Sequence, residues 1–417
     1  MLTLTPQIFP LFLLHLIVFF LPPSHQTLTA VELSALAAIK DSLTDLPTRS
    51  TPFFSTWNFS SPNPCASFSG LICSSSHHIT SLTLGNSDSP SLSGSLSPSI
   101  SNLTQLTQLI LSPGLVTGPL PPQLGSLMNL RVISLTNNRF TGTIPSSISS
   151  LHNLHTLDLS FNKLTGSIPP GIFAMPELKV LIIASNSLSG ELPRTITTTI
   201  SSLLHLDLKN NMLTGCLPLK MPLSLRYLSV SMNKMWGQLN GLESLSDLVY
   251  LDLSMNNFNG SIIPSLFRTS LSSLFLQRNN LSGVLPFPLS LSILPYAPGS
   301  VVDLSHNFLT GEIPAVLAEV ETLFLNNNHL TGKVPVEYVR SLAVGTTKTL
   351  YLQHNYITEF PLDDGVVLPK TLSLCLSYNC LSTVPPVGLT VCPASAGGEI
   401  SRPASQCAAF NNRGSLY

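Results

Sequence analysis

Charged side chains are scarce in this sequence. Lys, Arg, Asp and Glu make up 9% of the 417 residues, and the formal net charge is −1. So little charge produces no field strong enough to recruit nucleic acid or anionic lipid. We therefore expect neither of these partners.

Apolar runs long enough to span a bilayer are also missing. The most apolar stretch, residues 8–21, is shorter than the roughly 20 residues that a membrane helix needs, and two prolines follow it. This pattern is typical of a secretory signal peptide, which we predict over residues 1–30 with cleavage between Ser24 and Ala30. No Lys or Arg precedes the run, so an uncleaved anchor is the alternative.

The C-terminal segment 394–417 is polar and resembles neither a membrane helix nor a lipid-anchor signal. We therefore predict a secreted protein without a membrane span. It would act in the extracellular space or the cell wall, or be held at the cell surface.

Cysteines are few and gather at the two ends of the chain, as expected in an oxidising compartment. We predict disulfides among these six: Cys65, Cys73, Cys375, Cys380, Cys392 and Cys407. The last four allow three connectivities, which the sequence leaves open. The seventh, Cys216, adjoins an apolar leucine, and we expect a buried thiol there, with intermolecular pairing as the alternative.

Four Asn-X-Ser/Thr triplets become possible glycosylation sites once the chain is assigned to the secretory pathway. They begin at Asn58, Asn102, Asn259 and Asn280.

What the sequence has in abundance is a repeat. Leu-x-Leu-x-x-Asn recurs about every 24 residues, most clearly in Leu157-Asp-Leu159-Ser-Phe-Asn162, and we count thirteen units. Spacings of 28 residues between Asn279 and Asn307, and of 27 between Asn328 and Asn355, predict two modest protruding loops.

The chemistry of the unit predicts its conformation. Two leucines that flank one residue point to the same side of a short strand and face a core. The asparagine amide can bond backbone groups that the following bend leaves without partners. Gly166 permits a backbone conformation closed to other residues, and the Ile168-Pro169 step enforces an extended turn. One coil cannot bury its own apolar face, so the coils must stack and the ends of the stack need caps.

These residues resemble the plant-type leucine-rich-repeat extracellular proteins, whose unit reads Leu-x-x-Leu-x-Leu-x-x-Asn-x-Leu-x-Gly-x-Ile-Pro. Residues 31–40, Trp57 and the Cys65 to Cys73 pair look like that family's amino-terminal cap. Phe68 stands where the family usually has tryptophan near a glycine, which implies different packing at this cap.

The repeat and the resemblance together predict an α/β solenoid. We expect a right-handed curved superhelix of about 13 repeats, with short parallel strands on its concave face and disulfide caps at both ends. The domains would be a signal peptide at 1–30, an N-terminal cap at 31–78, the solenoid at 79–385, and a C-terminal cysteine-containing cap with a flexible tail at 386–417.

A ligand is expected on the concave face, the surface that repeat proteins commonly use. Aromatic and arginine side chains on neighbouring coils have the composition of a protein-binding hot spot. The candidate binding residues are Phe161, Arg226, Tyr227, Tyr250, Phe275, Arg278, Phe324 and Tyr351. We interpret the aspartates that recur at 158, 207, 252 and 303 as repeat consensus.

No enzyme motif is evident, so we expect neither catalysis nor a cofactor. Gly345-Thr-Thr-Lys348-Thr349 lacks the glycines of a phosphate loop and is interpreted as an inter-repeat loop. His77 and His78 lack further ligand residues nearby, so no metal site is predicted.

The expected function is recognition of a peptide, protein or cell-wall glycan, in plant defence or development, with a membrane receptor kinase as the signalling partner. The alternative, drawn from the resemblance to polygalacturonase-inhibiting proteins, is inhibition of a secreted cell-wall-degrading hydrolase. A structural wall component is a third possibility.

Overall fold

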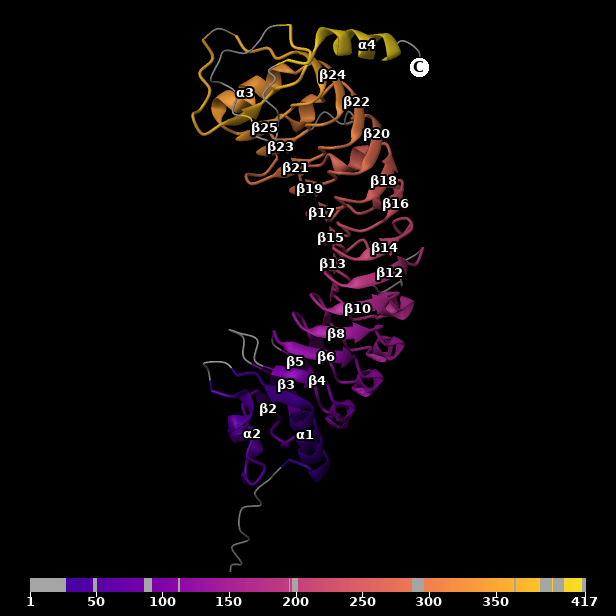
Figure 1. The fold of residues 1–417 in the computed structure, drawn as a ribbon, viewed down its shortest axis with the longest axis vertical. Helices are drawn as coiled ribbons and strands as arrows, with labels where there is room; N and C mark the ends of the chain where they lie inside the picture. The colour runs from indigo at the N-terminus through magenta and orange to yellow at the C-terminus, as the bar shows by residue number, and fades with distance from the viewer. Residues whose placement is uncertain are drawn as a thin grey trace, which may run out of the picture.

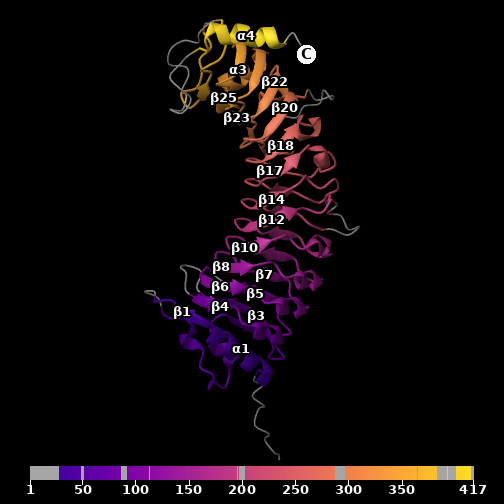
Figure 2. The ribbon, with the colours of Figure 1, turned by 45° about the vertical axis from the view of Figure 1, so that its right-hand side comes forward.

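The computed structural model describes residues 28–47, 51–85, 92–111, 113–194, 196, 202–286, 296–363, 365–382, 392 and 401–414. These residues form one curved stack of short coils, with the N-terminal cap at one end and helix α4 at the other (Figures 1 and 2). The predicted signal peptide lies almost wholly outside the described residues. Within the described parts, no helix is long and apolar enough to cross a membrane.

The concave face is a single fourteen-stranded sheet, lining the inner side of the arc in Figure 1. Strand β2 (Leu71–Cys73) pairs antiparallel at one end, and the other thirteen strands are mutually parallel, which confirms the thirteen units. They are β3 (Ile79–Leu84), β5 (Gln108–Leu111), β7 (Val132–Ser134), β9 (Thr156–Asp158), β11 (Val180–Ile182), β13 (His205–Asp207), β15 (Tyr227–Ser229), β17 (Tyr250–Asp252), β19 (Ser273–Phe275), β21 (Val301–Asp303), β23 (Thr322–Phe324), β25 (Thr349–Tyr351) and β27 (Ser373–Cys375).

A second row of strands, which the sequence analysis did not anticipate, follows the concave strands from β3 to β25 along the chain, and β1 of the N-terminal cap joins it. It forms a seven-stranded and a six-stranded sheet, parallel except where β1 joins β4. We call this row the outer flank. Its strands are β1 (Leu43–Asp45), β4 (Leu92–Ser95), β6 (Leu115–Pro119), β8 (Arg139–Gly142), β10 (Lys163–Gly166), β12 (Ser187–Glu191), β14 (Met212–Thr214), β16 (Trp236–Gly237), β18 (Asn257–Gly260), β20 (Asn280–Val284), β22 (Phe308–Gly311), β24 (His329–Lys333) and β26 (Tyr356–Glu359).

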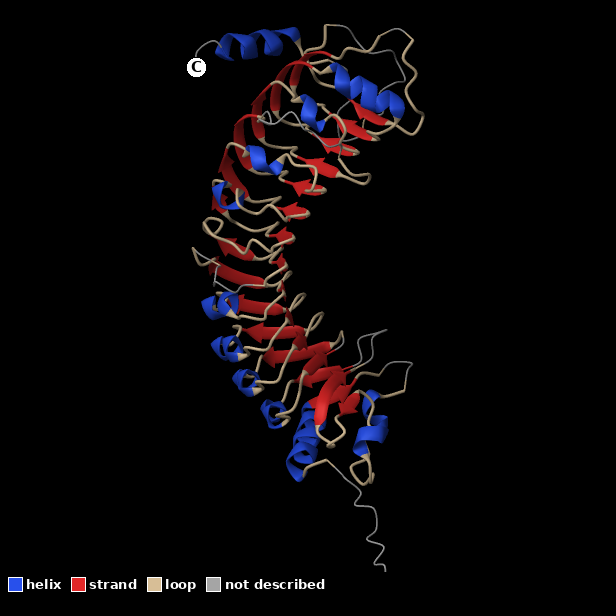
Figure 3. Cartoon of the chain, turned by 180° about the vertical axis from the view of Figure 1, so that it is seen from behind, coloured by secondary structure: helices blue, strands red, loops and turns tan. Residues whose placement is uncertain are grey.

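Short helices return the chain on the convex side, seen along the outer edge of the arc in Figure 3. The 3₁₀ helices are η1 (Phe53–Thr56), in the N-terminal cap, and η2 (Pro98–Asn102), η3 (Pro122–Ser126), η4 (Ser146–Ser150), η5 (Pro170–Ala174), η6 (Asn240–Leu242), η7 (Pro264–Leu266) and η8 (Ala315–Leu317). The α-helices are α1 (Ala30–Ser42) and α2 (Pro64–Ser67) in the N-terminal cap, α3 (Val336–Val344), and α4 (Ala404–Gly414).

The leucines of the repeat fill one continuous core. Leu157, Leu206 and Leu251 are at most 1% exposed and belong to a single cluster that runs through the stack. Each lies in the middle of its strand and pairs in register with leucine or isoleucine on the neighbouring strands. The predicted shared interior is confirmed.

The repeated asparagines join one coil to the next. The Nδ2 of Asn256 donates to the carbonyls of Val230 (2.9 Å) and Leu253 (3.2 Å), and its Oδ1 accepts the N–H of Met235 at 2.9 Å. Asn162 makes the same three kinds of bond. The predicted role of these amides is therefore confirmed. Gly166 adopts a φ of 77°, as expected for the glycine that follows them.

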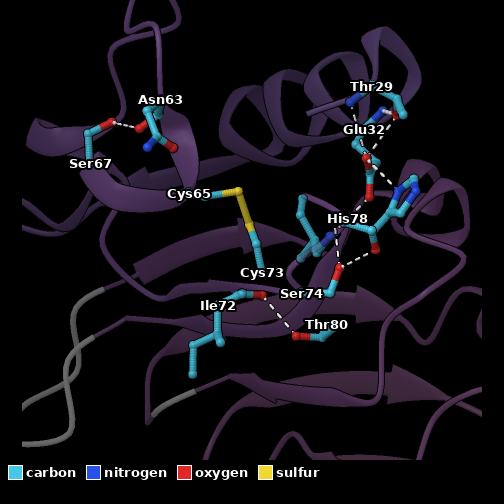
Figure 4. The surroundings of a disulfide bond; sticks show 12 residues. Thr29, Glu32, Asn63, Cys65, Ser67, Ile72, Cys73, Ser74, His78 and Thr80 are labelled. Atoms are coloured by element: carbon cyan, nitrogen blue, oxygen red, sulfur yellow. Dashed lines mark hydrogen bonds and ion pairs between the residues drawn. A yellow bond between two sulfur atoms is a disulfide. The ribbon is translucent and has the colours of Figure 1, made fainter. Parts of the chain in front are cut away.

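The N-terminal cap is held by a disulfide between Cys65 and Cys73 and by a buried carboxylate (Figure 4). Glu32, 3% exposed, forms a capping box with Thr29 and accepts from the backbone N–H of Ile79 at 3.0 Å. His78 Nδ1 lies 3.3 Å from the same carboxylate. Helix α1 is thereby bonded to the first strand of the solenoid.

Two details of this cap bear on the sequence analysis. Leu28 is 3% exposed and Thr29 caps α1, so residues that the predicted boundary assigns to the signal peptide take part in the folded cap. A cut before Leu28 would preserve them. Phe68 is buried and stacks on Trp57 with centroids 5.2 Å apart, so a phenylalanine fills the position at which the resemblance implied altered packing.

The C-terminal cap has two disulfides, Cys375–Cys392 and Cys380–Cys407, which settle the connectivity that the sequence left open. Arg402 lies over the rings of Tyr356 (4.1 Å) and Tyr378 (4.5 Å) and donates to the carbonyl of Asn355. Part of the segment expected as a cap with a flexible tail is thus helix α4, fixed over the last coils.

Two predictions are wrong: the protruding loop after Asn328 and the buried thiol of Cys216. Of the two expected loops, the one after Asn328 is helix α3, which packs inward because Tyr338 and Leu342 lie on one face and are fully buried. The other falls partly on residues 287–295, outside the described residues. Cys216 is exposed, because it occupies the outward position after Gly215 on the outer flank, and its neighbour Leu217 is the buried one.

The loop expected at residues 345–349 is confirmed. Gly345 ends α3 with a φ of 79°, and Thr349 begins β25. Between them, Lys348 forms an ion pair with Glu321 at 3.1 Å.

Candidate functional site

The concave sheet presents its outward side chains in columns that run from coil to coil. Because side chains alternate along a strand, the residues on either side of each central leucine face the same way. The first column contains Thr156, Val180, His205, Tyr227, Tyr250, Ser273 and Val301, each in register with the next. The second contains Asp158, Ile182, Asp207, Ser229, Asp252, Phe275, Asp303, Phe324 and Tyr351.

Three rings in the first column form a stack that we call the aromatic ladder: His205, Tyr227 and Tyr250. The His205 and Tyr227 centroids are 3.9 Å apart, those of Tyr227 and Tyr250 are 4.3 Å apart, and both pairs are within 5° of parallel. The cause is the register of β13, β15 and β17, which places the three side chains directly beside one another. The result is a half-buried stack of rings across three coils, in which both faces of Tyr227 are covered by the neighbouring rings.

Burial keeps the ladder uncharged. It lowers the pKa of His205 below its ordinary value and raises the pKa values of Tyr227 and Tyr250. At neutral pH the ladder is therefore a neutral surface whose polar atoms are at its ring edges. Such rings can cover apolar or planar groups of a partner at low entropic cost.

Phe275 extends the aromatic surface into the second column. Its ring lies 5.6 Å from that of Tyr250 at an angle of 50°, and its strand neighbours in register are Asp252 and Asp303. The candidate residues Tyr227, Tyr250 and Phe275 are thus brought together. Arg226 is exposed just before Tyr227.

A separate aromatic pair lies nearer the C-terminal cap. Phe324 and Tyr351 occupy adjacent strands in the second column, with centroids 5.2 Å apart and nearly perpendicular rings. The Tyr351 hydroxyl shares a hydrogen bond with Ser373 at 3.0 Å. The coil of Asp303 separates this pair from Phe275, so the candidate residues form two groups.

Two candidate residues lie beyond the C-terminal ends of their strands. Phe161 and Arg278 have left-handed backbone conformations, with φ of 54° and 56°, and each immediately precedes a repeat asparagine. The chain has already turned out of the strand at this point, so these side chains lie along the margin of the concave face. We call this row the margin ridge.

The margin ridge also holds two residues that the sequence analysis missed. Met232 and Met255 are 47% and 46% exposed, and both have a φ of 54°. Left-handed backbone is costly for side chains other than Gly, Asn and Asp. The available signal was a large apolar residue directly before the repeat asparagine, on the two coils that carry Tyr227 and Tyr250.

The recurring aspartates form hydrogen bonds within their own coils, as expected if they belong to the repeat consensus. Asp158 and Asp252 accept from the N–H and hydroxyl of the serine two residues later. Burial raises the pKa values of Asp207 and Asp303. Within the described residues, no group of three or more His, Cys, Asp or Glu side chains is arranged to hold a metal ion.

The four predicted glycosylation asparagines, Asn58, Asn102, Asn259 and Asn280, are all exposed. Asn259 and Asn280 are neighbours in register on β18 and β20 of the outer flank. Asn102 ends η2 on the convex side, and Asn58 lies in the N-terminal cap. None of the four belongs to the concave columns.

Comparison with protein-family models agrees with this architecture. The leucine-rich-repeat N-terminal domain matches residues 30–74, and leucine-rich-repeat models match residues 128–188 and 247–269. The matches fall on the disulfide-linked cap and on coils of the stack. These matches show that the chain carries leucine-rich repeats behind a leucine-rich-repeat N-terminal domain.

The curated relatives of this leucine-rich-repeat protein include plant receptor-like proteins. It is 36% identical over 137 residues to Receptor-like protein 35 of Arabidopsis thaliana, a match covering 29% of this chain and 14% of that protein. It is 33% identical over 161 residues to Receptor-like protein 18 of the same plant, covering 36% and 18%. The matches span less than a fifth of these relatives.

Solved structures show the same fold. The plant peptide hormone receptor RGFR1 in complex with RGF2 aligns with a TM-score of 0.56 and 27% identity, covering 69% of this chain and 50% of the receptor chain. A plant ice-binding protein aligns with a TM-score of 0.57 and 27% identity, covering 81% of this chain and 98% of that one. The ectodomain of the plant membrane receptor kinase GASSHO1/SCHENGEN3 from Arabidopsis thaliana, in complex with CASPARIAN STRIP INTEGRITY FACTOR 2, aligns with a TM-score of 0.53 and 27% identity, covering 79% of this chain and 47% of that one.

Proposed function

We propose that this leucine-rich-repeat protein is a non-enzymatic extracellular recognition protein that binds a peptide or protein segment on its concave face, at the aromatic ladder and Phe275. The observation that carries the proposal is the parallel stacking of His205, Tyr227 and Tyr250 across three neighbouring coils.

The composition of this surface favours a peptide over a bulky or highly charged ligand. Aromatic rings, the margin methionines Met232 and Met255, and hydrogen-bonding ring edges lie within four neighbouring coils. Side chains that present large area with few rotatable bonds dominate protein-binding hot spots. A ligand that crosses these coils would place successive side chains against successive rings.

For signalling, we propose a second protein as the partner, a membrane receptor kinase. Defence and development are the processes in which we expect such recognition. The solved complexes of plant receptors with their ligands among the structural neighbours support this proposal by analogy of fold.

The test is affinity capture of peptides from extracellular plant fluid on the purified full-length mature chain. The variant Tyr227→Ala/Tyr250→Ala/Phe275→Ala should lose the captured ligand. The matched control removes three exposed large side chains from the outer flank, Met212→Ala/Trp236→Ala/Phe308→Ala, and should retain it. Equal capture by the two triple variants would contradict the proposed surface.

The alternative function, inhibition of a polygalacturonase, predicts a different result. Titration of a fungal polygalacturonase with the purified chain would lower its activity stoichiometrically. Stoichiometric inhibition that survives the concave triple variant would replace the peptide-recognition proposal.

A further inference from the structure

One carboxylate of the concave face has surroundings that the repeat consensus does not explain. Asp252 follows Tyr250 by two residues on β17, so both side chains face outward. Its neighbours in register in the second column are Ser229 and Phe275. The rings of Tyr250 and Phe275 are 5.6 Å apart and tilted by 50°, so the carboxylate borders two ring surfaces that are inclined to each other.

Asp252 also lacks a cationic partner. Its Oδ1 accepts from the N–H of Ser254 at 3.0 Å and from the Ser254 hydroxyl at 2.6 Å. Among the ion pairs of the described residues, none includes Asp252. By contrast, Asp207 has the Lys209 ammonium 3.7 Å away.

The remaining charges nearby reinforce the difference. Asp303, one column step beyond Phe275, experiences the positive charge of Arg278, which offsets part of the pKa increase caused by burial. Burial is the main cause of the raised pKa values of Tyr227 and Tyr250, and the charges of Asp207 and Asp252 both contribute to them. A half-buried negative charge beside two rings favours a cation that ring faces can cover.

We propose that Asp252, Tyr250 and Phe275 form a subsite for the guanidinium group of an arginine side chain in the peptide ligand; this inference rests on the proposed function above. The carboxylate supplies a charge-assisted hydrogen bond, and a guanidinium within about 6 Å of ring centroids gains a cation–π attraction. Arginine is favoured over lysine because its planar guanidinium can stack on a ring while its in-plane N–H groups donate to the carboxylate.

Asp158 provides a comparison within the same chain. Its Oδ1 accepts from Ser160 N–H at 3.0 Å and from the Ser160 hydroxyl at 2.6 Å, the same local bonds that Asp252 makes. Its neighbours in register are Ser134 and Ile182, neither of which has a ring. The consensus therefore explains the turn at both aspartates, whereas the aromatic neighbours distinguish Asp252.

The experiment uses two small probes of equal shape. N-acetyl-arginine methylamide carries the cation, and N-acetyl-citrulline methylamide replaces it by a neutral urea group. Saturation-transfer NMR on the full-length chain measures the dissociation constant of each probe. For the wild-type chain, we expect the arginine probe to bind about tenfold more tightly than the citrulline probe.

The variants then locate the subsite. Asp252→Asn keeps the acceptor for Ser254 and should weaken the arginine probe about tenfold without changing the citrulline probe. Asp158→Asn is the matched control and should bind both probes as the wild-type chain does. Equal binding of the two probes, or equal weakening by the two Asp→Asn substitutions, would overturn the proposal. Unchanged melting curves establish that each variant is folded.

Failure of this subsite can be distinguished from failure of the proposed function. If the Tyr227→Ala/Tyr250→Ala/Phe275→Ala variant loses its captured peptide while Asp252→Asn retains full affinity for it, the arginine subsite is wrong and peptide recognition stands. If no concave variant alters capture but the arginine probe still distinguishes Asp252→Asn, the subsite stands and the proposed function is wrong.

Discussion

At the residue scale, the inward leucines contribute mainly by filling space. Leu157 is fully buried between Ile133 and Leu181 of the neighbouring coils. Truncation leaves a cavity that the adjoining strands cannot close, because their own spacing is fixed by backbone hydrogen bonds.

We therefore expect Leu157→Ala to lower the free energy of unfolding by about 2–5 kcal/mol. Denaturant titration followed by circular dichroism measures the loss. Lys163→Ala, an exposed position on the next strand of the same coil, should stay within about 0.5 kcal/mol of the wild-type chain. A similar change in both variants would argue against a shared core at Leu157.

The asparagine amides contribute through hydrogen bonds rather than volume. Asn256→Ala leaves the buried N–H of Met235 without its Oδ1 acceptor, so we expect a loss of about 1–3 kcal/mol. Asn257→Ala, at the exposed adjacent position, is the control. Hydrogen exchange at the Met235 amide offers a second readout, since it should become faster only in the Asn256 variant.

At the scale of elements, the last coils depend on a segment that is remote in sequence. Helix α4 is fixed by the Cys380–Cys407 disulfide, and Phe410 stacks on Tyr356 with centroids 3.7 Å apart. His329 contacts Phe308, Tyr356 and Phe410. The helix therefore covers the outer-flank strands that end the stack.

Removing this disulfide should loosen the end of the stack. We expect Cys380→Ser/Cys407→Ser to lower stability by about 2–4 kcal/mol and to speed hydrogen exchange over residues 404–414. Cys216→Ser, which removes the exposed thiol outside any disulfide, should change neither quantity. Protection of α4 that survives the double substitution would show that ring packing alone holds the helix.

The same element should respond to acid. Burial, with the charge of Arg402 as a smaller cause, lowers the pKa of His329 in the folded chain. Below the unfolded value of about 6.5 the unfolded chain takes up a proton that the folded chain resists. Stability from this group is thus present above that pH and is lost as pH falls towards the lowered folded pKa.

We expect the melting temperature of the wild-type chain to decrease when the pH is lowered from 7 to 5. The decrease should be smaller in the His329→Asn variant. Calorimetry at the two pH values measures both. His152→Asn, at an exposed histidine in the turn after η4, serves as the control and should follow the wild-type curve.

At the scale of the whole molecule, the stack separates the proposed recognition surface from two of the predicted glycosylation sites. The aromatic ladder lines the concave sheet, whereas Asn259 and Asn280 lie on the outer flank. Glycans there would project away from a concave ligand.

This separation predicts that a glycan is tolerated on one surface and not on the other. Tyr227→Asn creates the triplet Asn-Leu-Ser on the ladder, and glycosylation there should abolish peptide capture. Tyr227→Gln removes the ring without adding a glycan, so it reports the loss of the ring alone. Asn259→Gln/Asn280→Gln should leave capture unchanged, and reduced capture would place the ligand on the outer flank.

Much of this fold was determined by the sequence alone, because the same short-range interactions recur in each of the thirteen repeats. Leu-x-Leu alternation, the asparagine amide and Gly166 each act within one coil or on its neighbour, so their spacing predicts the strand, the turn and the stacking. The cysteines identified the caps because they gather at the two ends of the chain, where the stack has no further coil to cover it.

Only the tertiary structure decided which outward residues meet. The register that stacks His205 on Tyr227, and places Asp252 beside Phe275, depends on the twist and offset of coils more than twenty residues apart. Phe161 and Arg278 lie on the margin ridge, and Cys216 is exposed, because a single step along a coil changes the direction of a side chain. Composition predicts that rings are present, whereas the distances between coils decide which of them form a surface.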